Sequence, residues 1–209
     1  MTDENKIIPF NPLDKRNLGE NVCQAMLRQQ VVHMSSILKF RGAGIYAIYF
    51  SGRFPAYKPI AMLNRGGAYK APIYVGKAVP KGSRKGGELE SAPGNDLYSR
   101  LIQHARSIQD ASNLEIKDFH CRYLVVDDIW IPLAESLLIA TFNPLWNKLV
   151  DGFGNHDPGK GRHMGLRPRW DVIHPGRAWA ERCQPRTESS TRILGEINDY
   201  LRNNPVDID

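Results

Sequence analysis

Two short apolar segments, each combining glycine with tyrosine, constrain the fold of this chain more than any other feature. Gly44-Ile45-Tyr46 opens a run to Phe50 that is dense in β-branched and aromatic residues, and Ile73-Tyr74-Val75-Gly76 lies in a similar run. Such side chains favour strands, and glycine or proline beside them marks the strand ends. We therefore expect two strands, over about 45–50 and 72–77, and their tyrosines are the first candidates for a functional site.

The patterns on either side of these runs predict a mixture of helices and strands. Apolar residues near helical spacing predict a helix over about 20–38. Asp96 is placed to cap a helix to about Gln109, residues 119–126 resemble a third strand, and Pro132 fits the first turn of a helix to Phe142. A last helix is expected around 188–202. Residues 51–71, with two prolines and a Gly-Gly pair, are expected to be a mostly irregular insert.

This order of elements predicts an α+β fold with a small core. The core would hold a three-stranded antiparallel sheet flanked by helices, with an N-terminal helix, an internal insert and a C-terminal extension added to it. We expect a single compact domain, with an N-terminal arm and helix over 1–43, a catalytic core over 44–150 and an extension over 151–209. A DNA-binding insert would occupy about 51–71 of that core.

The distribution of charge points to a polyanionic partner. The net charge is +6, yet no aspartate or glutamate occurs from Asn21 to Gly87, where eleven lysines and arginines lie. A long acid-free stretch of this kind is typical of nucleic-acid binding, although a solvated basic surface would give the same pattern.

The composition also indicates where in the cell the protein is expected. No apolar run approaches the roughly 20 residues that span a bilayer, so we expect no membrane association. The polar N-terminus is unlike a signal peptide, and three scattered cysteines are typical of reduced thiols. We therefore expect a cytoplasmic protein.

Three side chains downstream of the strands have the chemistry for phosphate hydrolysis. Arg100 and His104 are spaced to share one helix face, where a guanidinium can hold a phosphate with two hydrogen bonds. Glu135 lies in the first turn of its helix, and one carboxylate suffices for Mg²⁺, which keeps several waters. Each of these residues can also be explained without catalysis. Glu135 complements the helix dipole at its position, and Arg100 and His104 fit a solvated helix surface. The strand tyrosines likewise fit half-buried positions in a sheet.

Taken together and in this order, these residues resemble the GIY-YIG nuclease family. Members carry Gly-Ile-Tyr and Tyr-Val-Gly on adjacent strands, then a helix with arginine and histidine, then a single metal-binding glutamate. The similarity covers about Gly44 to Asn147 and implies metal-dependent hydrolysis of a phosphodiester, with one Mg²⁺ held by Glu135. It implies a catalytic set formed by Tyr46, Tyr74, Lys77, Arg100, His104, Glu135 and Asn147.

The resemblance also implies roles for these residues. Tyr46, helped by Tyr74, His104 and Lys77, would take a proton from the attacking water, although the sequence does not decide which tyrosine is the base. Arg100 would steady the phosphate, and Asn147 would brace the site.

The length of the insert narrows the resemblance further. Between Tyr46 and Ile73 lie 26 residues, which is similar to the type II restriction endonucleases of this family, particularly the small group that cuts GC-rich palindromes. Residues 151–156 (Asp-Gly-Phe-Gly-Asn-His) and 170–177 (Trp-Asp-Val-Ile-His-Pro-Gly-Arg) resemble sequence blocks of that group. The resemblance implies cleavage of double-stranded DNA, with CCGCGG as the expected site. It also implies a homodimer and a cognate DNA methyltransferase in a bacterial cell.

The basic side chains of the loops are the candidates for contact with DNA. Arginine is the expected reader of guanine in the major groove, and lysine contacts phosphates. Two rival functions share this charge pattern: a repair-type or structure-specific GIY-YIG nuclease, and a DNA-binding module without catalysis. The candidates for DNA contact are Arg53, Arg65, Lys70, Lys81, Arg84, Lys160, Arg162 and Arg167.

Overall fold

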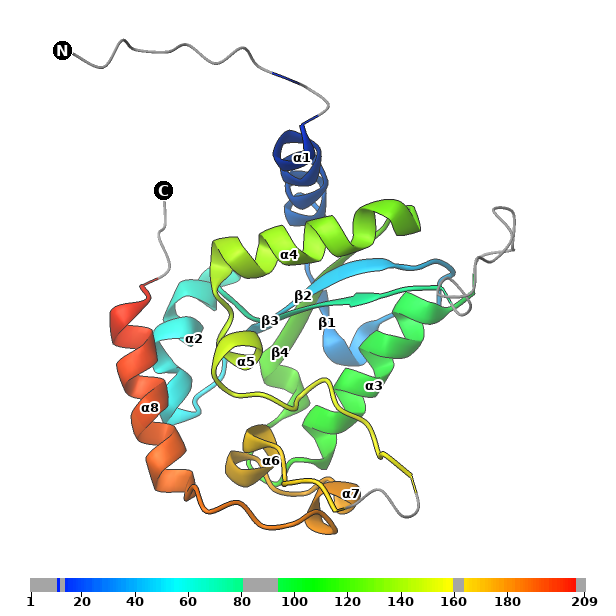
Figure 1. Cartoon of the computed structure of the whole chain (residues 1–209). Coiled ribbons are helices and arrows are strands. Elements are labelled where there is room, and N and C mark those ends of the chain that lie inside the picture. Colours follow the sequence, from blue (N-terminus) through cyan, green and yellow to red (C-terminus); the bar gives the residue numbers. More distant parts are fainter. Residues whose placement is uncertain (1–10, 12–13, 81–93, 160–163, 206–209) are drawn as a thin grey trace, which may run out of the picture.

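A four-stranded antiparallel sheet lies at the centre of the computed structural model, which describes residue 11 and residues 14–80, 94–159 and 164–205 (Figure 1). Its strand order is β1-β4-β2-β3. The two tyrosine-bearing strands are neighbours, as predicted, and Tyr46 lies opposite Gly76 on one side and Tyr123 on the other. The α+β class is confirmed, although the sheet has four strands and not three. The strands are β1 (Val32–His33), β2 (Gly44–Phe50), β3 (Pro72–Ala78) and β4 (Phe119–Val125).

The additional strand lies in a segment that was predicted to be helical. Helix α1 (Lys15–Leu27) ends well before Leu38, and β1 and a short 3₁₀ turn, η1 (Met34–Ser36), follow it. The helix prediction was therefore wrong after Leu27. Val32 pairs with Cys121 of β4, and Met34 is buried, but Leu38 is 82 % exposed. Hydrogen bonding to a distant strand thus overrides a local apolar spacing that only resembled a helical face.

Helices cover both faces of the sheet. Helices α1 and α4 (Ile131–Phe142) lie on one face and α3 (Asp96–Asp110) on the other (Figure 1). Every residue of β2 is buried, and its side chains alternate between two apolar clusters. Ile45 and Ala47 pack with α1 and α4, whereas Tyr46 and Ile48 pack on the side of α3. The pleat of β2 therefore directs the Tyr46 ring toward α3.

The insert is ordered, in contrast to the irregular structure that was expected. It contains the turn η2 (Pro55–Tyr57), helix α2 (Lys58–Asn64) and the turn η3 (Arg65–Gly67). The prolines are the reason for the error, since proline also fits the first turn of a short helix. Asn64 is buried and hydrogen bonds to Phe50 and Ala71, which joins the end of α2 to the strands before and after the insert.

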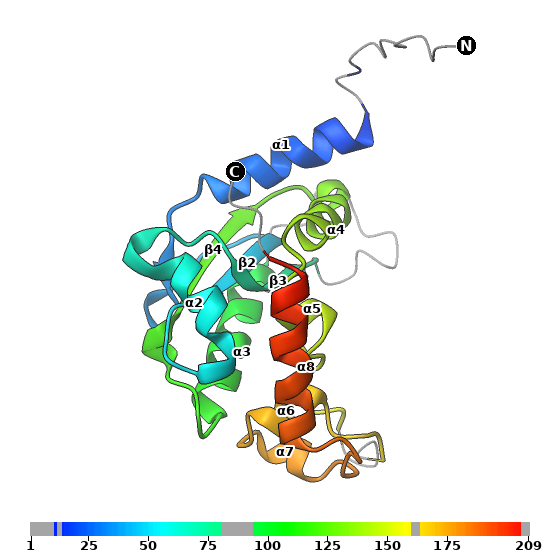
Figure 2. The same ribbon diagram turned by 90° about the vertical axis from the view of Figure 1, so that its left-hand side faces the viewer.

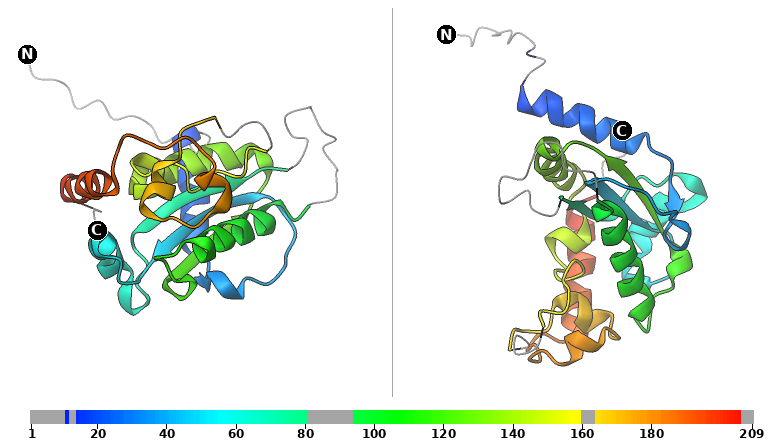
Figure 3. Two further views of the ribbon diagram at one scale, coloured as in Figure 1. Left: turned by 90° about the horizontal axis from the view of Figure 1, so that it is seen from below. Right: turned by 90° about the vertical axis from the view of Figure 1, so that its right-hand side faces the viewer.

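The C-terminal extension packs on the α3 side of the sheet. It contains α6 (Arg169–Ile173), α7 (Ala178–Glu181) and α8 (Ser190–Asn203), after the short α5 (Leu145–Lys148). Seen from below, α3 and the extension lie in front of the sheet, with α4 behind it (Figure 3). Helix α8 lies on the same side of the molecule as α2 and contacts α6 and η2 (Figure 2). The predicted C-terminal helix is confirmed within two residues.

The remaining turns are η5 (Ile116–Asp118) and η6 (Asp128–Trp130), which lie before β4 and α4. No helix within the described ranges is both long and apolar enough to cross a membrane.

Candidate active site

The Tyr46 hydroxyl and the His104 ring form the buried centre of the site. Tyr46 projects from β2 and His104 from α3, and the tyrosine oxygen lies 2.6 Å from His104 Nε2. Neither side chain is more than 1 % exposed. Burial raises the pKa of Tyr46 well above its usual value and lowers that of His104 well below its usual value. Both groups are therefore neutral at pH 7 and are joined by a short hydrogen bond.

Gly76 leaves the space that the Tyr46 ring occupies. It lies opposite Tyr46 on the edge strand β3. A Cβ atom at this position would collide with the Tyr46 hydroxyl and would come within 3.0 Å of the Tyr74 ring. Glycine is thus required at position 76 because the Tyr46 and Tyr74 side chains occupy the space that a Cβ atom would need. This is a steric reason for the glycine in Tyr74-Val75-Gly76.

Tyr74 and Arg100 line the open side of the centre. The Tyr74 ring lies 6.2 Å from that of Tyr46 and 5.2 Å from that of His104, measured between centroids. Burial raises the pKa of Tyr74, while the positive charge of Arg100 acts to lower the pKa of both tyrosines. A second cation or a metal ion nearby would act in the same direction as Arg100.

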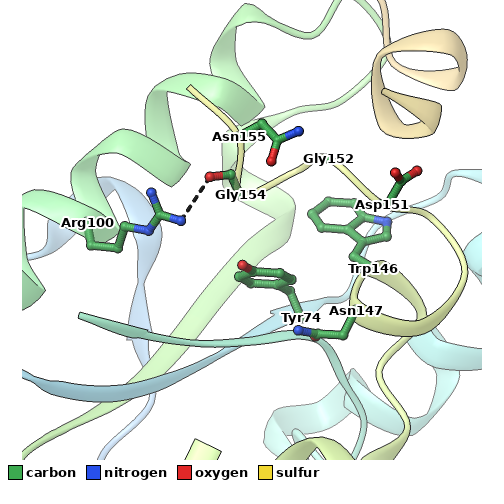
Figure 4. A pocket seen from close by; sticks show the side chains of 8 residues that line it. All are labelled: Tyr74, Arg100, Trp146, Asn147, Asp151, Gly152, Gly154 and Asn155. Atoms are coloured by element: carbon green, nitrogen blue, oxygen red, sulfur yellow. Dashed lines mark hydrogen bonds between the residues drawn. The ribbon is translucent and has the colours of Figure 1, made fainter. Parts of the chain in front are cut away.

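The guanidinium of Arg100 is held by a loop of the C-terminal extension. Arg100 Nη2 donates to the carbonyl oxygen of Gly154 at 2.9 Å (Figure 4). Arg100 Nη1 contacts Nε2 of His156. We call residues 152–156 the 152–156 loop. This loop also supplies Phe153, whose ring stacks on His104 at 4.5 Å between centroids and contacts Tyr74 edge-on at 5.0 Å.

Asn147 is bound to the backbone of β3. Its Oδ1 accepts from the Val75 N–H and its Nδ2 donates to the Val75 carbonyl, both at 2.8 Å. The backbone N–H and carbonyl of Val75 face away from β2, on the outer edge of β3. The Asn147 side chain therefore pairs with backbone groups that no neighbouring strand pairs. Asn147 thereby fixes the edge of β3 between Tyr74 and Gly76.

Glu135 approaches the edge strand from the opposite face of the sheet. It projects from α4, its side chain is 18 % exposed, and it forms a 2.7 Å ion pair with Nζ of Lys77 on β3. Its negative charge acts to raise the pKa of both Tyr46 and Tyr74. The site therefore spans the edge of β3, with Tyr46 and His104 on one face and Lys77 and Glu135 on the other.

The donor set around Glu135 fits a magnesium ion better than a structural metal. Within the residues that the structure describes, no cluster of three or more histidine, cysteine or acidic side chains is present. Zinc sites in proteins use three or four such ligands. Mg²⁺ is bound by one or two carboxylates, with waters and substrate phosphates completing the shell. The lone, partly buried carboxylate of Glu135, which is paired with Lys77, is compatible with that arrangement.

A pocket of about 290 Å³ opens beside the buried centre (Figure 4). The Tyr74 ring forms its floor, with Arg100 on one side and Trp146 on the other. The pocket thus gives a polar group from outside access to both the Arg100 guanidinium and the Tyr74 hydroxyl. Its lining residues are Tyr74, Arg100, Trp146, Asn147, Asp151, Gly152, Gly154 and Asn155.

The structure brings the seven predicted catalytic residues together from five elements, β2, β3, α3, α4 and α5. Their roles in catalysis remain predictions. Sequence reasoning did not assign a role to Phe153, Gly154 or His156 of the 152–156 loop, or to Arg177, which binds that loop. The only signal in the sequence was that both lie in the two blocks over 151–156 and 170–177.

The predicted DNA-contact residues are more scattered. Arg53, Arg65 and Lys70 are exposed on the insert. Arg167 instead donates to the carbonyl oxygens of Ala180 and Glu181, and so links two parts of the extension. Lys81, Arg84, Lys160 and Arg162 lie outside the described residues.

Comparison with known proteins gives an independent finding about the chain. A family model described as the Eco29kI GIY-YIG domain matches residues 38–201 of the 209 residues. No curated protein matches the chain. The matched segment begins before β2 and ends within α8, so it includes all seven predicted catalytic residues, the insert and the 152–156 loop.

Proposed function

Because the chain belongs to the GIY-YIG family, in its restriction endonuclease branch, we propose that it is a metal-dependent type II restriction endonuclease. Its substrate would be double-stranded DNA, cut at a GC-rich palindrome for which CCGCGG is the expected sequence. The observation that carries this proposal is the grouping of the seven predicted side chains around the edge of β3, where Tyr74, Arg100 and Asn147 line the pocket. A DNA-binding module without catalysis has no need of a buried tyrosine–histidine pair beside an arginine and a carboxylate.

The proton path begins at Tyr46. With His104 neutral and its Nε2 unprotonated, the imidazole accepts the Tyr46 proton across the 2.6 Å hydrogen bond. The resulting phenolate takes a proton from the attacking water. The pKa of Tyr46 is raised by burial, so this step depends on nearby positive charge, which Arg100 supplies and a bound metal ion would increase.

Arg100 is the group that binds the scissile phosphate. Its guanidinium has five N–H donors in a planar fork, which matches two phosphate oxygens. In the absence of DNA the guanidinium contacts Gly154 and His156. The incoming phosphate would compete with the exposed His156 for one edge of the fork, while Gly154 continues to hold the other.

Glu135 is the residue that would hold the metal. When bound there, a divalent ion stabilises negative charge on the phosphate and the leaving oxygen. The Lys77 ammonium, now paired with Glu135 at 2.7 Å, would release that carboxylate and turn toward the phosphate or Tyr46. Asn147 holds β3 and thus the distance between Lys77 and Tyr74.

Several further properties follow from this assignment. A palindromic site calls for a two-fold symmetric dimer, one active site for each strand. The basic residues Arg53, Arg65 and Lys70, together with those outside the described ranges, would contact DNA. A cell that contains such an enzyme needs a cognate methyltransferase to protect its own sites.

The test is digestion of methylation-free plasmid and phage DNA with Mg²⁺ and with EDTA. We expect discrete fragments with Mg²⁺ alone, and their ends would give the recognition sequence. Glu135→Gln should bind DNA but fail to cut it. Glu115→Gln is the matched control, because Glu115 forms an exposed ion pair with Lys117 elsewhere on the surface, and it should cut at the rate of the unmodified protein.

Other outcomes would assign the rival functions. Smears or nicks in place of fragments would indicate a repair-type or structure-specific nuclease. Intact DNA, with binding that requires no metal, would indicate a DNA-binding module on a nuclease scaffold.

A further inference from the structure

Arg177 is a buried arginine that lies outside the catalytic set. Only 2 % of the residue is exposed. Its Nε donates to Asp171 Oδ1 at 2.7 Å and its Nη2 to Asp171 Oδ2 at 2.5 Å, so the pair is bidentate. The guanidinium carbon also lies 4.5 Å from the Trp170 ring and 4.8 Å from the Trp179 ring. The position and orientation of the Arg177 fork are therefore fixed from three sides.

The remaining donors of Arg177 bind the 152–156 loop. Nη2 donates to the Gly152 carbonyl at 2.9 Å, and Nη1 donates to the carbonyls of Phe153 and Asn155 at 3.1 and 3.2 Å. Three of four consecutive carbonyl groups thus point at one guanidinium. The fourth, that of Gly154, points away and accepts from Arg100. Because Gly154 lies between Phe153 and Asn155 in the chain, holding the carbonyls of these two neighbours also restricts the direction of the Gly154 carbonyl.

The same loop bears directly on the buried centre of the site. The Phe153 ring stacks on His104 with an interplanar angle of 17°. Gly154 lies so close to Tyr74 that a Cβ atom would come within 2.7 Å of the Tyr74 hydroxyl and 3.2 Å of Arg100 Nη2. Three catalytic side chains therefore touch a loop whose backbone is held by Arg177.

We propose that Arg177, oriented by Asp171, is a positioning residue that sets Arg100 and His104 in register for hydrolysis through the 152–156 loop. The proposal gives a function to the two sequence blocks at 151–156 and 170–177. The first block contains the loop, and the second contains Asp171 and Arg177, the clamp that holds the loop. It rests on the proposed nuclease function for its kinetic test, but its structural test is independent of cleavage.

The ion pair itself is not required for stability. A buried ion pair can be replaced by apolar side chains of similar volume with little change in stability, whereas removal of one partner leaves a costly buried charge. The double variant Asp171→Leu, Arg177→Met therefore removes the clamp without leaving a charge. Displacements of about 1 Å at a catalytic group can lower rates roughly 100-fold.

The kinetic test compares single-turnover cleavage by the double variant and the unmodified protein at saturating DNA. We expect the rate constant to fall about 100-fold, with DNA affinity within about threefold and thermal unfolding still cooperative. A purely structural role would lower the folded fraction, and hence the amplitude, but not the rate constant. A rate constant within about threefold of the unmodified protein would overturn the proposal.

The structural test follows the His104 ring by proton NMR. The chain has six histidines, and the His104 signal is identified by its loss in His104→Gln. The stacked Phe153 ring shifts this signal, so release of the loop in the double variant should move it. If the unmodified protein cuts no DNA, the nuclease proposal fails while this measurement still decides the positioning role. An unmoved His104 signal would overturn it.

If the double variant does not fold, a single variant and its control provide the test. Arg177→Lys keeps a charge beside Asp171 but lacks the donors to reach three carbonyls, and it should reproduce both effects in part. Arg186→Lys is the matched control, because Arg186 pairs with Glu188 in the same extension and does not touch the 152–156 loop. It should leave the rate constant and the His104 signal unchanged.

Discussion

Among single side chains, Tyr46 and His104 lose contact with water to the same extent, and their pKa values move in opposite directions. The charged form of each is disfavoured, so the phenol and the imidazole both stay neutral. A neutral imidazole is a proton acceptor, and a neutral phenol is a donor. Both shifts oppose transfer of the Tyr46 proton to His104, so such a transfer requires added positive charge beside the phenolate.

Removal of the Tyr46 hydroxyl tests this pairing. We expect Tyr46→Phe to lower the single-turnover cleavage rate by about 10²- to 10⁴-fold, the usual contribution of a general base. The unpaired His104 nitrogen should also cost about 1–3 kcal/mol of unfolding free energy, measured by urea denaturation. Tyr49→Phe is the control, since Tyr49 faces the other side of β2 and contacts Arg122. Equal rates for Tyr46→Phe and Tyr49→Phe would contradict the assignment of Tyr46.

The residues of the site differ in how far the sequence could predict them. Tyr46, Tyr74 and Glu135 could be proposed as site residues because they lie at characteristic places on strands and a helix. Arg177 could not, since an arginine in a basic segment indicates a surface charge, and its burial depends on Asp171 and two tryptophans folding around it. Burial of a charge is a property of tertiary packing that local pattern does not record.

At the scale of elements, helix α8 fastens the extension to the core. Ile193 and Ile197 are fully buried on its inner face, and Tyr200 donates to the Asn143 carbonyl after α4. Arg169 of α6 forms ion pairs with Glu188 and Glu196. The helix therefore supports α6, which carries Asp171, and indirectly the 152–156 loop.

Two substitutions in α8 should change stability in opposite directions. Ile197→Ala removes buried methyl groups and should lower the unfolding free energy by about 2–5 kcal/mol. Gly195→Ala places a methyl where no atom lies within 4 Å, and it should raise the unfolding free energy by about 0.5–1 kcal/mol because glycine is a poor helix former. Urea denaturation measures both. A stabilising Ile197→Ala or a strongly destabilising Gly195→Ala would show that α8 is packed differently.

Apart from α1, the helices and strands were predictable where their apolar pattern extended over two or more periods. Helices α3 and α4 and the strands β2, β3 and β4 were found within about two residues. The two-residue strand β1 and the short helices α2, α6 and α7 were not. Segments of two to seven residues contain less than two periods of a helical pattern, so long-range contacts decide their conformation.

In the molecule as a whole, the sheet separates the site into two parts that meet at the edge of β3. Tyr46 and His104 are enclosed between the sheet and α3, whereas Glu135 and Lys77 lie on the α4 side. The pocket at this edge is therefore reached from outside without opening the core. A long polymer can pass along such an edge, as it could not enter a closed cavity.

Buried neutral histidines should make the stability of the whole fold depend on pH. Burial lowers the pKa of His174 to about 3 and that of His104 well below 6.5. Below pH 6.5 the unfolded chain binds protons that the folded chain does not, so unfolding becomes easier as pH falls. Each of the two histidines should remove up to about 1.4 kcal/mol per pH unit.

Denaturation between pH 5 and 7 measures this dependence. His174→Gln should reduce the slope of unfolding free energy against pH by up to one proton, most at the acid end of this range, because the amide does not titrate. The comparison isolates His174 from the carboxyl groups, whose titration both proteins share. Parallel slopes for the two proteins would show that His174 is not buried in its neutral form.

The amide of Asn147 has a consequence beyond catalysis, because β3 is the last strand of its sheet. Free N–H and C=O groups on an edge strand are a template for pairing with a strand of another molecule, which is a route to aggregation. Asn147 occupies both groups of Val75. Asn147, which braces β3 beside the candidate site, thus also covers part of the edge on which the sheet could otherwise grow.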